Sequence, residues 1–328
     1  MRLRCILLVF LFSPFIGEAR AIPSPNETRA LDLHLYGNYI KADFETLIIP
    51  IKRINRLLVV EARVDTLVGN FIIDTGAPGL VLNNTYFRKY WISSDFIASN
   101  AASTSSGPVR NTWVNELEVK ELRLEQLKAR LTELGHIENQ TNTRILGLLG
   151  VSILKSFTVT IDLQQNVLIL QRTDRAGQSK HELENLKGKT PHNKSVFKLV
   201  NNSILLPAHI AGKKLLFCLD TGAETNVISS TAPQKALATF RVARRSVLLG
   251  TGGASVEVLA GKLEKITIGS VAYYNMNTIV SNLEGLGQAY GESIHGMIGF
   301  DLLTKGIISI NFVKKELSIY PYTNSTDE

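Results

Sequence analysis

The chain alternates short apolar runs with polar turns, and this pattern predicts β-strands through most of its length. Residues 71–73 and 217–219 are apolar runs that stop at Asp-Thr-Gly, as a buried strand stops at a turn. Apolar positions alternate on both sides of the polar stretch 164–166, which indicates a hairpin. Short helices are expected near residues 83–89 and 230–237, and just after Gly150 and Gly299. The pattern therefore predicts an all-β fold with minor helix.

The same pattern occurs twice along the chain. Three blocks recur in the same order: residues 57–76 align on 203–222 at an offset of 146, 147–150 on 296–299 at an offset of 149, and 157–170 on 306–319 at the same offset. Three blocks with nearly constant spacing are the sign of an internal repeat. The sequence therefore predicts a tandem duplication, with two similar units in one chain.

One stretch gives conflicting signals. Residues 116–134 are rich in helix formers, whereas the corresponding stretch 263–274 is rich in β-formers and contains a Gly-Ser turn. An alignment at an offset of 144 places Leu122, Leu124 and Leu127 on Ile266, Ile268 and Val271. Because tertiary context overrides local propensity, both stretches are predicted to be hairpins.

The repeats divide the chain into segments. Repeat 1 is predicted at 46–171, an exposed hydrophilic linker at 172–195, repeat 2 at 196–322 and a C-terminal tail at 323–328. Residues 22–45 form an N-terminal extension that contains the apolar residues Leu31, Leu33, Leu35 and Ile40. We expect this extension to pack on repeat 1 as an extra strand and helix; the alternative is a propeptide that is removed on activation.

The first 21 residues are typical of a signal peptide. Arg2 and Arg4 supply a positive start, residues 5–16 are almost continuously apolar, and 19–21 read Ala-Arg-Ala, the small-x-small pattern of a cleavage site. The apolar run is shorter than the ~20 residues of a membrane span, so an uncleaved anchor is the weaker alternative. We therefore expect an exported protein, periplasmic or secreted, cleaved near Ala21 and without stable membrane insertion.

Composition narrows the function classes. The 328 residues are 45% hydrophobic and 20% charged, as in ordinary globular domains, and two cysteines exclude a disulfide framework. The net charge of +7 is spread along the chain without a dense basic run, so nucleic-acid binding is not expected. The six histidines lack metal-ligand spacing, and neither a metal nor a cofactor is expected. Cys218 has no paired histidine and is predicted to be a buried core residue rather than a nucleophile.

The candidate chemistry lies in the two Asp-Thr-Gly turns. One such turn is weak evidence, but Asp74 and Asp220 stand at equivalent points of the two repeats. A duplicated β-unit brings equivalent points together across its pseudo-twofold axis, so the two carboxyl groups are expected to face each other. Two adjacent carboxyl groups share one proton. One then activates a water as general base while the other polarises the carbonyl under attack.

The neighbouring residues suit this arrangement. Thr75 and Thr221 place hydroxyl groups where they can bond across the axis, and Gly76 and Gly222 let backbone approach the carboxyl groups closely. The apolar-apolar-Gly segments 148–150 and 297–299 are expected to pack beneath the turns.

These motifs resemble those of the aspartic peptidases of the pepsin and retroviral-protease superfamily, and the resemblance covers both repeats. Because Ala77 and Ala223 follow the motifs, each repeat is more similar to a retroviral-type subunit than to a pepsin lobe. The resemblance implies two β-barrel lobes related by a pseudo-twofold axis in a single-chain fused dimer, a monomer acting as a pseudo-dimer, of bacterial, exported type. It also implies a β-hairpin flap over bound peptide, with Gly250, Thr251, Gly252 and Gly253 at the tip in repeat 2, or an ordinary hairpin turn there.

The sequence departs from the family pattern at two places. Repeat 1 lacks a glycine-rich tip, and residues 99–110 occupy that stretch without a tyrosine of the pepsin type. Ala77 and Ala223 cannot supply the hydroxyl that pepsin-type enzymes carry after the motif, so we expect activity to extend towards about pH 5–6. The sequence thus predicts an aspartic endopeptidase that acts on a peptide or protein. The alternatives are a peptide-binding protein with the same fold, and a precursor whose residues 22–45 block the site.

Overall fold

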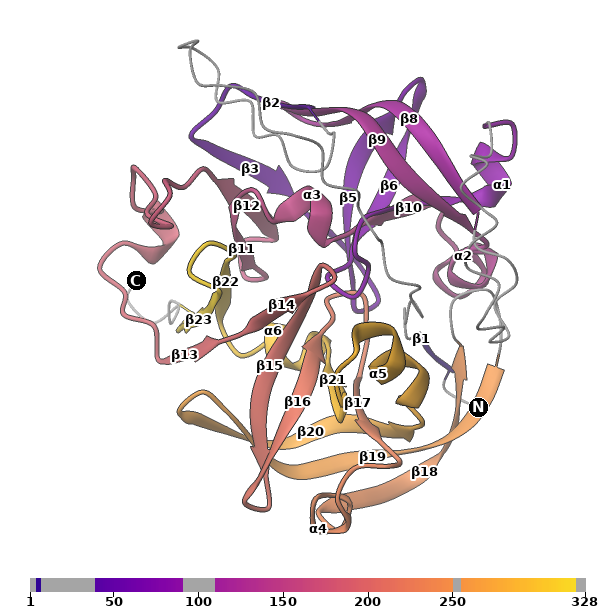
Figure 1. Cartoon of the computed structure of the whole chain (residues 1–328), viewed down its shortest axis with the longest axis vertical. Coiled ribbons are helices and arrows are strands. Elements are labelled where there is room, and N and C mark those ends of the chain that lie inside the picture. Colours follow the sequence, from indigo (N-terminus) through magenta and orange to yellow (C-terminus); the bar gives the residue numbers. More distant parts are fainter. Residues whose placement is uncertain (1–3, 7–38, 91–109, 250–254, 323–328) are drawn as a thin grey trace, which may run out of the picture.

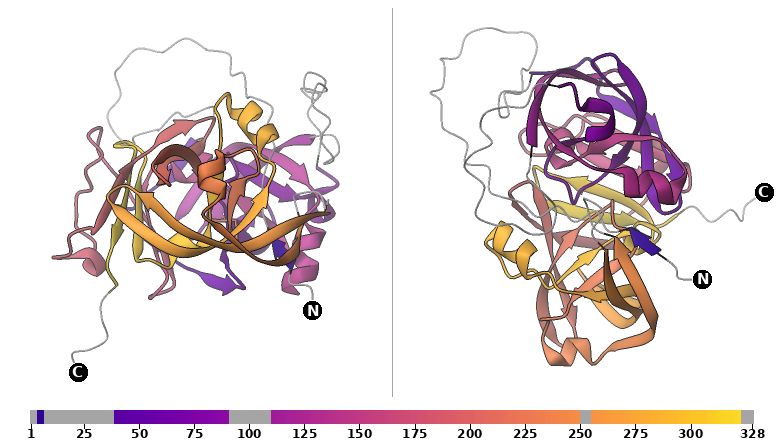
Figure 2. Two further views of the ribbon diagram at one scale, coloured as in Figure 1. Left: turned by 90° about the horizontal axis from the view of Figure 1, so that it is seen from below. Right: turned by 90° about the vertical axis from the view of Figure 1, so that its right-hand side faces the viewer.

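The protein folds into two β-rich lobes, one for each repeat, with a third sheet between them (Figure 1). The computed structural model describes residues 4–6, 39–90, 110–249 and 255–322. Repeat 1 forms the upper lobe in Figure 1 and repeat 2 the lower lobe, and the side view in Figure 2 shows the same division. The prediction of an all-β fold with minor helix is confirmed. Most of the predicted signal peptide, the predicted flap tip Gly250–Gly253 and the C-terminal tail lie outside the described residues.

The lobe of repeat 1 is built on one twisted sheet. Its strands are β2 (Tyr39–Ala42), β4 (Lys52–Ile54), β5 (Leu57–Val64), β6 (Leu67–Ile73), β7 (Leu80–Asn83), β8 (Arg110–Val119), β9 (Leu122–Thr132) and β10 (Ile145–Leu149). The order is β2-β9-β7-β10-β6-β5-β4, and β8 pairs with β5 and β9. Three short helices accompany it: α1 (Asn84–Phe87), α2 (Gly135–Thr141) and α3 (Val151–Leu154).

The lobe of repeat 2 has the same plan. Its sheet has the order β1-β18-β19-β20-β17-β21-β16-β15-β14. The strands are β1 (Arg4–Ile6), β14 (Lys198–Val200), β15 (Ser203–Ile210), β16 (Lys213–Leu219), β17 (Asn226–Ser229), β18 (Phe240–Leu249), β19 (Ser255–Ile268), β20 (Val271–Ser281) and β21 (Gly296–Ile298). The helices α4 (Gln234–Leu237), α5 (Glu284–Tyr290) and α6 (Phe300–Leu303) complete it. The predicted short helices are thus present in both repeats.

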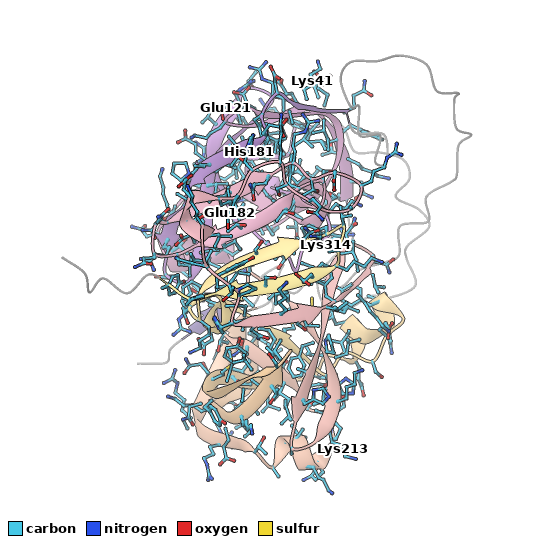
Figure 3. The ribbon with its side chains drawn as sticks, turned by 90° about the vertical axis from the view of Figure 1, so that its left-hand side faces the viewer. Lys41, Glu121, His181, Glu182, Lys213 and Lys314 are labelled. Atoms are coloured by element: carbon cyan, nitrogen blue, oxygen red, sulfur yellow. The ribbon has the colours of Figure 1, made fainter. Side chains whose placement is uncertain are left out.

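The two lobes share a six-stranded sheet. Its order is β13 (Asn193–Val196), β23 (Glu316–Tyr320), β22 (Ile307–Asn311), β11 (Thr158–Asp162), β12 (Val167–Gln171) and β3 (Thr46–Pro50). The central pair β11–β22 is antiparallel and joins one repeat to the other. The sheet lies between the lobes, whose outer ends carry Lys41 and Glu121 on one side and Lys213 on the other (Figure 3). It therefore fixes how the two lobes face each other.

Both stretches with conflicting sequence signals are hairpins, β8–β9 and β19–β20. The register proposed from the sequence is wrong by five residues. In the structure Glu118 lies opposite Arg63 and Thr267 opposite His209, so β8 corresponds to β19 at an offset of 149 rather than 144. The apolar positions Leu117 and Leu122 therefore correspond to Ile266 and Val271. Alternating apolar residues permit both alignments, and only the neighbouring strand distinguishes them.

The segment predicted to be an exposed linker is partly buried. Leu183 precedes the short helix η2 (Glu184–Leu186), and Leu186 is its last residue. Both leucines pack against Ile169 and Ile307 of the shared sheet. Asn193 begins β13 and is buried as well. These contacts correct the prediction, because the segment crosses the face of the shared sheet rather than only connecting the repeats.

Two N-terminal segments join the lobes as edge strands. Of the four apolar residues named for the N-terminal extension, Ile40 lies in β2 and is buried where this strand pairs with β9. Residues 4–6, inside the predicted signal peptide, form β1 and pair in parallel with Val247–Leu249 at the end of β18. Removal of the leader would leave this end of β18 as a sheet edge.

Candidate active site

The two Asp-Thr-Gly turns are held by equivalent backbone bonds in the two repeats. Asp74 follows β6, and its N–H donates to the carbonyl of Leu149 (3.0 Å); Asp220 follows β16, and its N–H donates to the carbonyl of Ile298 (2.9 Å). The residue after each turn accepts a bond from the start of a helix: Ala77 from Val151 and Ala223 from Phe300, both at 2.9 Å. The apolar-apolar-Gly segments thus support the turns, as expected from the sequence.

Thr75 and Thr221 connect the two turns directly. The hydroxyl of Thr75 accepts from the N–H of Thr221 (3.0 Å) and donates to the carbonyl of Leu219 (2.8 Å). The hydroxyl of Thr221 accepts from the N–H of Thr75 (3.0 Å) and donates to the carbonyl of Ile73 (2.7 Å). Each threonine therefore binds the backbone of the opposite repeat with both functions of its hydroxyl, and the four bonds fix the turns relative to each other.

Each carboxyl group lies against the glycine of the opposite turn. A Cβ atom on Gly76 would lie 2.5–2.7 Å from the carboxyl atoms of Asp220, and one on Gly222 would lie 2.7–3.0 Å from those of Asp74. Within its own turn, Oδ1 of Asp74 accepts from the N–H groups of Gly76 (2.8 Å) and Ala77 (3.1 Å). Oδ1 of Asp220 accepts from the N–H of Gly222 (2.8 Å). Only glycine permits this approach at either position.

The environment of the two carboxyl groups favours their protonated form. Both side chains have no exposed surface, and within the described part of the chain their Oδ2 atoms have no hydrogen-bond partner. Burial raises the pKa of Asp74 well above its usual value, and the nearby charge of Asp220 raises it further. Burial also raises the pKa of Asp220, although the interaction with Asp74 and backbone N–H groups of both turns oppose the shift. The pair is therefore expected to hold a proton at a pH where exposed aspartates are ionised.

A buried apolar cluster includes Ala77 and Ala223, the residues that follow the two turns, and we refer to it as the dyad-side cluster. It contains residues of both repeats: Leu57, Val59, Ile72, Ala77, Val81, Leu134, Ile137, Ile145, Leu148, Leu205, Cys218, Ala223, Val227, Leu248, Val258, Ala260, Ile279, Leu283, Leu286, Tyr290, Ile294 and Met297. Burial raises the pKa of the Cys218 thiol, and the charges of Asp220 and Asp74 raise it further. Cys218 is therefore a protonated core residue beside the carboxyl groups. The prediction that it lies in the core is confirmed.

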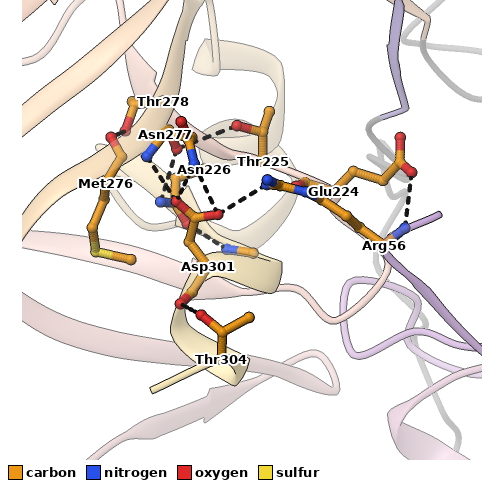
Figure 4. Close-up of polar contacts among 10 residues, drawn as sticks. Arg56, Glu224, Thr225, Asn226, Met276, Asn277, Thr278, Asp301 and Thr304 are labelled. Atoms are coloured by element: carbon orange, nitrogen blue, oxygen red, sulfur yellow. Dashed lines mark hydrogen bonds and ion pairs between the residues drawn. The ribbon is translucent and has the colours of Figure 1, made fainter. Parts of the chain in front are cut away.

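A polar network ties repeat 1 to the turn of repeat 2 (Figure 4). Arg56, in the turn just before β5, donates from Nη1 to the carbonyl of Glu224 (3.1 Å) and to Oδ1 of Asp301 (2.9 Å). Asp301 on α6 in turn accepts from the N–H of Asn277 (2.7 Å). The carbonyl of Asn277 accepts from Asn226 (3.0 Å), which follows the turn closely. We refer to Arg56, Glu224, Asn226, Asn277 and Asp301 as the latch.

The latch exists on one side of the molecule. The counterpart of Arg56 is Asn202, at the offset of 146, and that of Asp301 is Ser152, at 149. Asn202 instead accepts a single bond from Lys155 (2.9 Å). Sequence analysis did not identify Arg56 or Asp301 as site residues. The signal available was the loss of equivalence between the repeats at these positions, which the offsets of 146 and 149 reveal in the sequence.

Part of the chain matches a known family model. Residues 206–302, which lie in repeat 2 and include Asp220, match the family model for aspartyl protease. The resemblance to the aspartic peptidases is confirmed. No curated protein matches the chain. Among the described residues, no group of three or more His, Cys, Asp or Glu is arranged to hold a metal ion, and no helix is long and apolar enough to cross a membrane.

Two solved aspartic peptidases are similar to the chain. One is an aspartic proteinase from Irpex lacteus, with 13% identity and a TM-score of 0.49, which covers 86% of this chain and 98% of its own. The other is a retropepsin-like aspartic protease from Rickettsia conorii, with 18% identity and a TM-score of 0.27, which covers 43% of this chain and 96% of its own. Asp74, Thr75, Gly76, Asp220, Thr221 and Gly222 lie together in this chain, while Gly250–Gly253 lie outside the described residues.

Proposed function

We propose that this protein is an aspartic endopeptidase in which Asp74 and Asp220 are the catalytic residues. The observation that carries the proposal is the pair of buried carboxyl groups, each packed on the glycine of the opposite turn, in a chain that matches the aspartyl protease family. Two carboxyl groups in such a setting hold one proton between them, which places an acid and a base side by side.

The chemistry follows from that shared proton. The ionised carboxylate accepts a proton from a water molecule, whose oxygen attacks the peptide carbonyl. The protonated carboxyl donates a hydrogen bond to the carbonyl oxygen and stabilises the charge that develops there. Transfer of that proton to the same oxygen gives a tetrahedral diol and leaves on the pair the one proton taken from the water. When it collapses, the C–N bond breaks and a proton passes to the leaving nitrogen, which releases an amine and a carboxylic acid and restores the shared proton. The Oδ2 atoms of Asp74 and Asp220 receive no backbone hydrogen bond from the turns, so they are suited to contact the water and the substrate.

A second candidate is a peptide-binding protein that does not cleave. The observation that favours it is the complete burial of both carboxyl groups, because substrate reaches them only after whatever covers them has moved. Family members that do cleave close a hairpin over their peptide, and the tip of the corresponding hairpin lies outside the described residues. Activity therefore has to be measured on the chain itself.

The deciding experiment is cleavage of an unfolded protein mixture, read by mass spectrometry. It is carried out between about pH 3 and 7, because this range spans the usual and the raised pKa of a carboxyl group. The mature chain is compared with Asp74→Asn and Asp220→Asn. Asp43→Asn, a change of the same type at an exposed position, is the matched control. Cleavage by the parent and the control, with both dyad variants silent, supports the endopeptidase. A parent chain that retains peptides but cuts none at any pH would contradict it and favour the binding protein.

Export after cleavage near Ala21 is proposed alongside this function. It rests on the charged start, the apolar run and the Ala-Arg-Ala sequence alone. N-terminal sequencing of the protein recovered from its source decides it. A mature N-terminus near Ile22 supports the leader peptide, a start near Thr46 identifies residues 22–45 as a propeptide, and a retained Met1 contradicts both.

A further inference from the structure

Strand β9 places a cation beside the dyad-side cluster. Side chains along a strand alternate between its two sides. Ala129 and Leu131 belong to the core of repeat 1, so Arg130 between them points to the opposite side. The neighbouring strand agrees: Val81, which lies opposite Arg130 in the β7–β9 pair, belongs to the dyad-side cluster, whereas Leu80 belongs to the core. Arg130 therefore lies on the side of the dyad-side cluster, which includes Ala77 and Ala223, the residues that follow the two turns.

The second repeat has an aliphatic residue at this position. Leu80 pairs with Ala129 in β7–β9, and its counterpart Asn226 pairs with Thr278 in β17–β20. The residue equivalent to Arg130 is thus Ile279, which is 1% exposed and part of the dyad-side cluster. The strand pairs β7–β9 and β17–β20 thus have the same geometry, but at this position one carries a guanidinium and the other an isoleucine.

Arg130 and the two carboxyl groups each interact electrostatically with Tyr290. Burial lowers the pKa of Arg130 to about 10, and the interaction with Tyr290 opposes this shift. Tyr290 lies on α5 of repeat 2 and is 4% exposed; burial raises its pKa, and the charges of Cys218, Asp220 and Asp74 raise it further. Tyr290 is therefore within electrostatic reach of Arg130 on one side and of both carboxyl groups on the other. Below pH 7 Arg130 remains charged in this setting.

We propose that Arg130 is a specificity-determining residue that selects an aspartate or glutamate side chain of the substrate beside the dyad. The inference rests on the proposed function. A guanidinium recognises a carboxylate through two parallel hydrogen bonds, and the strength of that pair increases as water is excluded. Ile279 offers only apolar contact, so the substrate is expected to carry its acidic residue on one side of the scissile bond and an aliphatic residue at the equivalent position on the other.

The variant that tests the inference is Arg130→Ile, which installs the residue that repeat 2 already carries at the equivalent position. The substrates are a matched pair of peptides taken from a cleaved sequence, one with Glu and one with Gln at the acidic position. We expect the parent to prefer Glu by about tenfold or more in kcat/KM, and Arg130→Ile to show a ratio near one. Arg130→Lys keeps the charge without the planar fork and retains a reduced preference.

Arg123→Gln is the control, since Arg123 lies on the same strand with 55% of its side chain exposed and pairs with Glu118 at the surface. It keeps the ratio of the parent. A parent that cleaves the Glu and Gln peptides equally, or an Arg130→Ile variant that unfolds at the same temperature as the parent and still prefers Glu, overturns the inference.

A binding measurement separates this inference from the proposed function. Asp220→Asn, with and without Arg130→Ile, is used to capture members of a library of short peptides that contain Asp, Glu, Asn or Gln. Enrichment of acidic peptides that depends on Arg130 supports the inference even if the parent chain cuts nothing, in which case only the proposed function fails. Equal capture of acidic and amide peptides by the variant that retains Arg130 overturns the inference, whatever the parent cleaves.

Discussion

Thr160 lies opposite Ser309 in the strand pair that joins the lobes, and its hydroxyl donates a hydrogen bond to that of Ser309 (3.3 Å). Ser309 is also the residue that occupies the place of Thr160 in repeat 2, at the offset of 149. A residue that pairs with its own counterpart marks the pseudo-twofold axis. The reciprocal bonds of Thr75 and Thr221 mark the same relationship at the dyad. The shared sheet and the two turns therefore fix the same symmetry at two levels of the molecule.

The threonine bonds give the first prediction. Thr75→Val removes a hydroxyl and leaves the N–H of Thr221 and the carbonyl of Leu219 buried without it. Each unsatisfied buried group costs about 1–3 kcal/mol, so we expect a loss of roughly 3 kcal/mol in the free energy of unfolding. A small displacement of the turns also lowers kcat by about 100-fold. Urea unfolding and peptide cleavage measure the two effects. Thr75→Ser keeps the hydroxyl, and equal losses in both variants would contradict the assignment.

Burial of the two carboxyl groups predicts a dependence of stability on pH. Their pKa values are higher in the folded chain than in the unfolded chain, so the folded state binds protons that the unfolded state releases as the pH rises. The contribution of these protons to stability is complete below about pH 4 and is lost as the pH rises towards the raised pKa. Asp220→Asn removes one of the two carboxyl groups. We expect the variant to be about 1–3 kcal/mol more stable than the parent at pH 7.

Unfolding curves at pH 4 and pH 7 check this prediction. The advantage of Asp220→Asn should be small at pH 4, where the parent carboxyl groups are already protonated. Asp43→Asn, at an exposed position, should change neither curve. A variant that is less stable than the parent at pH 7 would show that the carboxylate of Asp220 is stabilising, which is opposite to the expected sign.

The same shift predicts where the enzyme works. Catalysis requires one proton on the pair, so the rate falls when the second carboxyl group is protonated at low pH and when both are ionised at high pH. With both groups fully buried and Ala77 and Ala223 supplying no hydroxyl, we expect kcat/KM to be greatest near about pH 5–6. Ala223→Ser adds a hydroxyl beside Asp220 and should move the acidic limb to lower pH. A parent profile that peaks near pH 2 would contradict the prediction.

The duplication and the paired turns could be predicted because both depend on short local patterns. Asp74 and Asp220 are recognised from the motif and its repetition, and the strand that precedes each turn is plain from its apolar residues. The register of Leu122 could not be predicted, because β9 alternates apolar residues that fit two alignments equally well, and the pairing of β8 with β5 decides between them. Sequence position also hides Arg56 and Asp301, which are 245 residues apart and meet only in the folded chain.

The linker shows a different limit. Leu183 and Leu186 stand among charged and polar neighbours, so composition predicts exposure. They are buried because the shared sheet offers them Ile169 and Ile307, and that sheet forms only when both repeats are in place. Burial of an isolated leucine is a property of the surface it meets, and the sequence around it carries little information about that surface.

The close approach at the turns predicts the effect of a single methyl group. In Gly76→Ala the new Cβ would lie within 2.5–2.7 Å of the Asp220 carboxyl group, closer than non-bonded atoms can approach. Either the carboxyl group or the turn must move, and we expect kcat to fall by at least about 100-fold. Gly135→Ala is the control, since a Cβ there meets nothing within 4 Å. Full activity in Gly76→Ala would show that the two carboxyl groups do not need this spacing.

The latch gives the last prediction, because it joins repeat 1 to the backbone that follows Asp220. Arg56→Met removes the guanidinium that Asp301 and the carbonyl of Glu224 share. Arg56 is 43% exposed, so solvent screens the pair and we expect only about 1–2 kcal/mol of lost stability. The larger effect should be on kcat, since Asp301 orders Asn277 and through it the residues after the turn.

Lys155→Met provides the matched comparison on the other side of the axis, where Lys155 binds Asn202 and no equivalent of Asp301 is present. We expect Arg56→Met to lower kcat about tenfold with little change in KM, and Lys155→Met to leave both near the parent values. If the two variants lose activity equally, the loss comes from general weakening of the contact between repeats. A loss confined to Arg56→Met shows instead that the asymmetric latch positions Asp220, so that two nearly equivalent carboxyl groups are held by unequal surroundings.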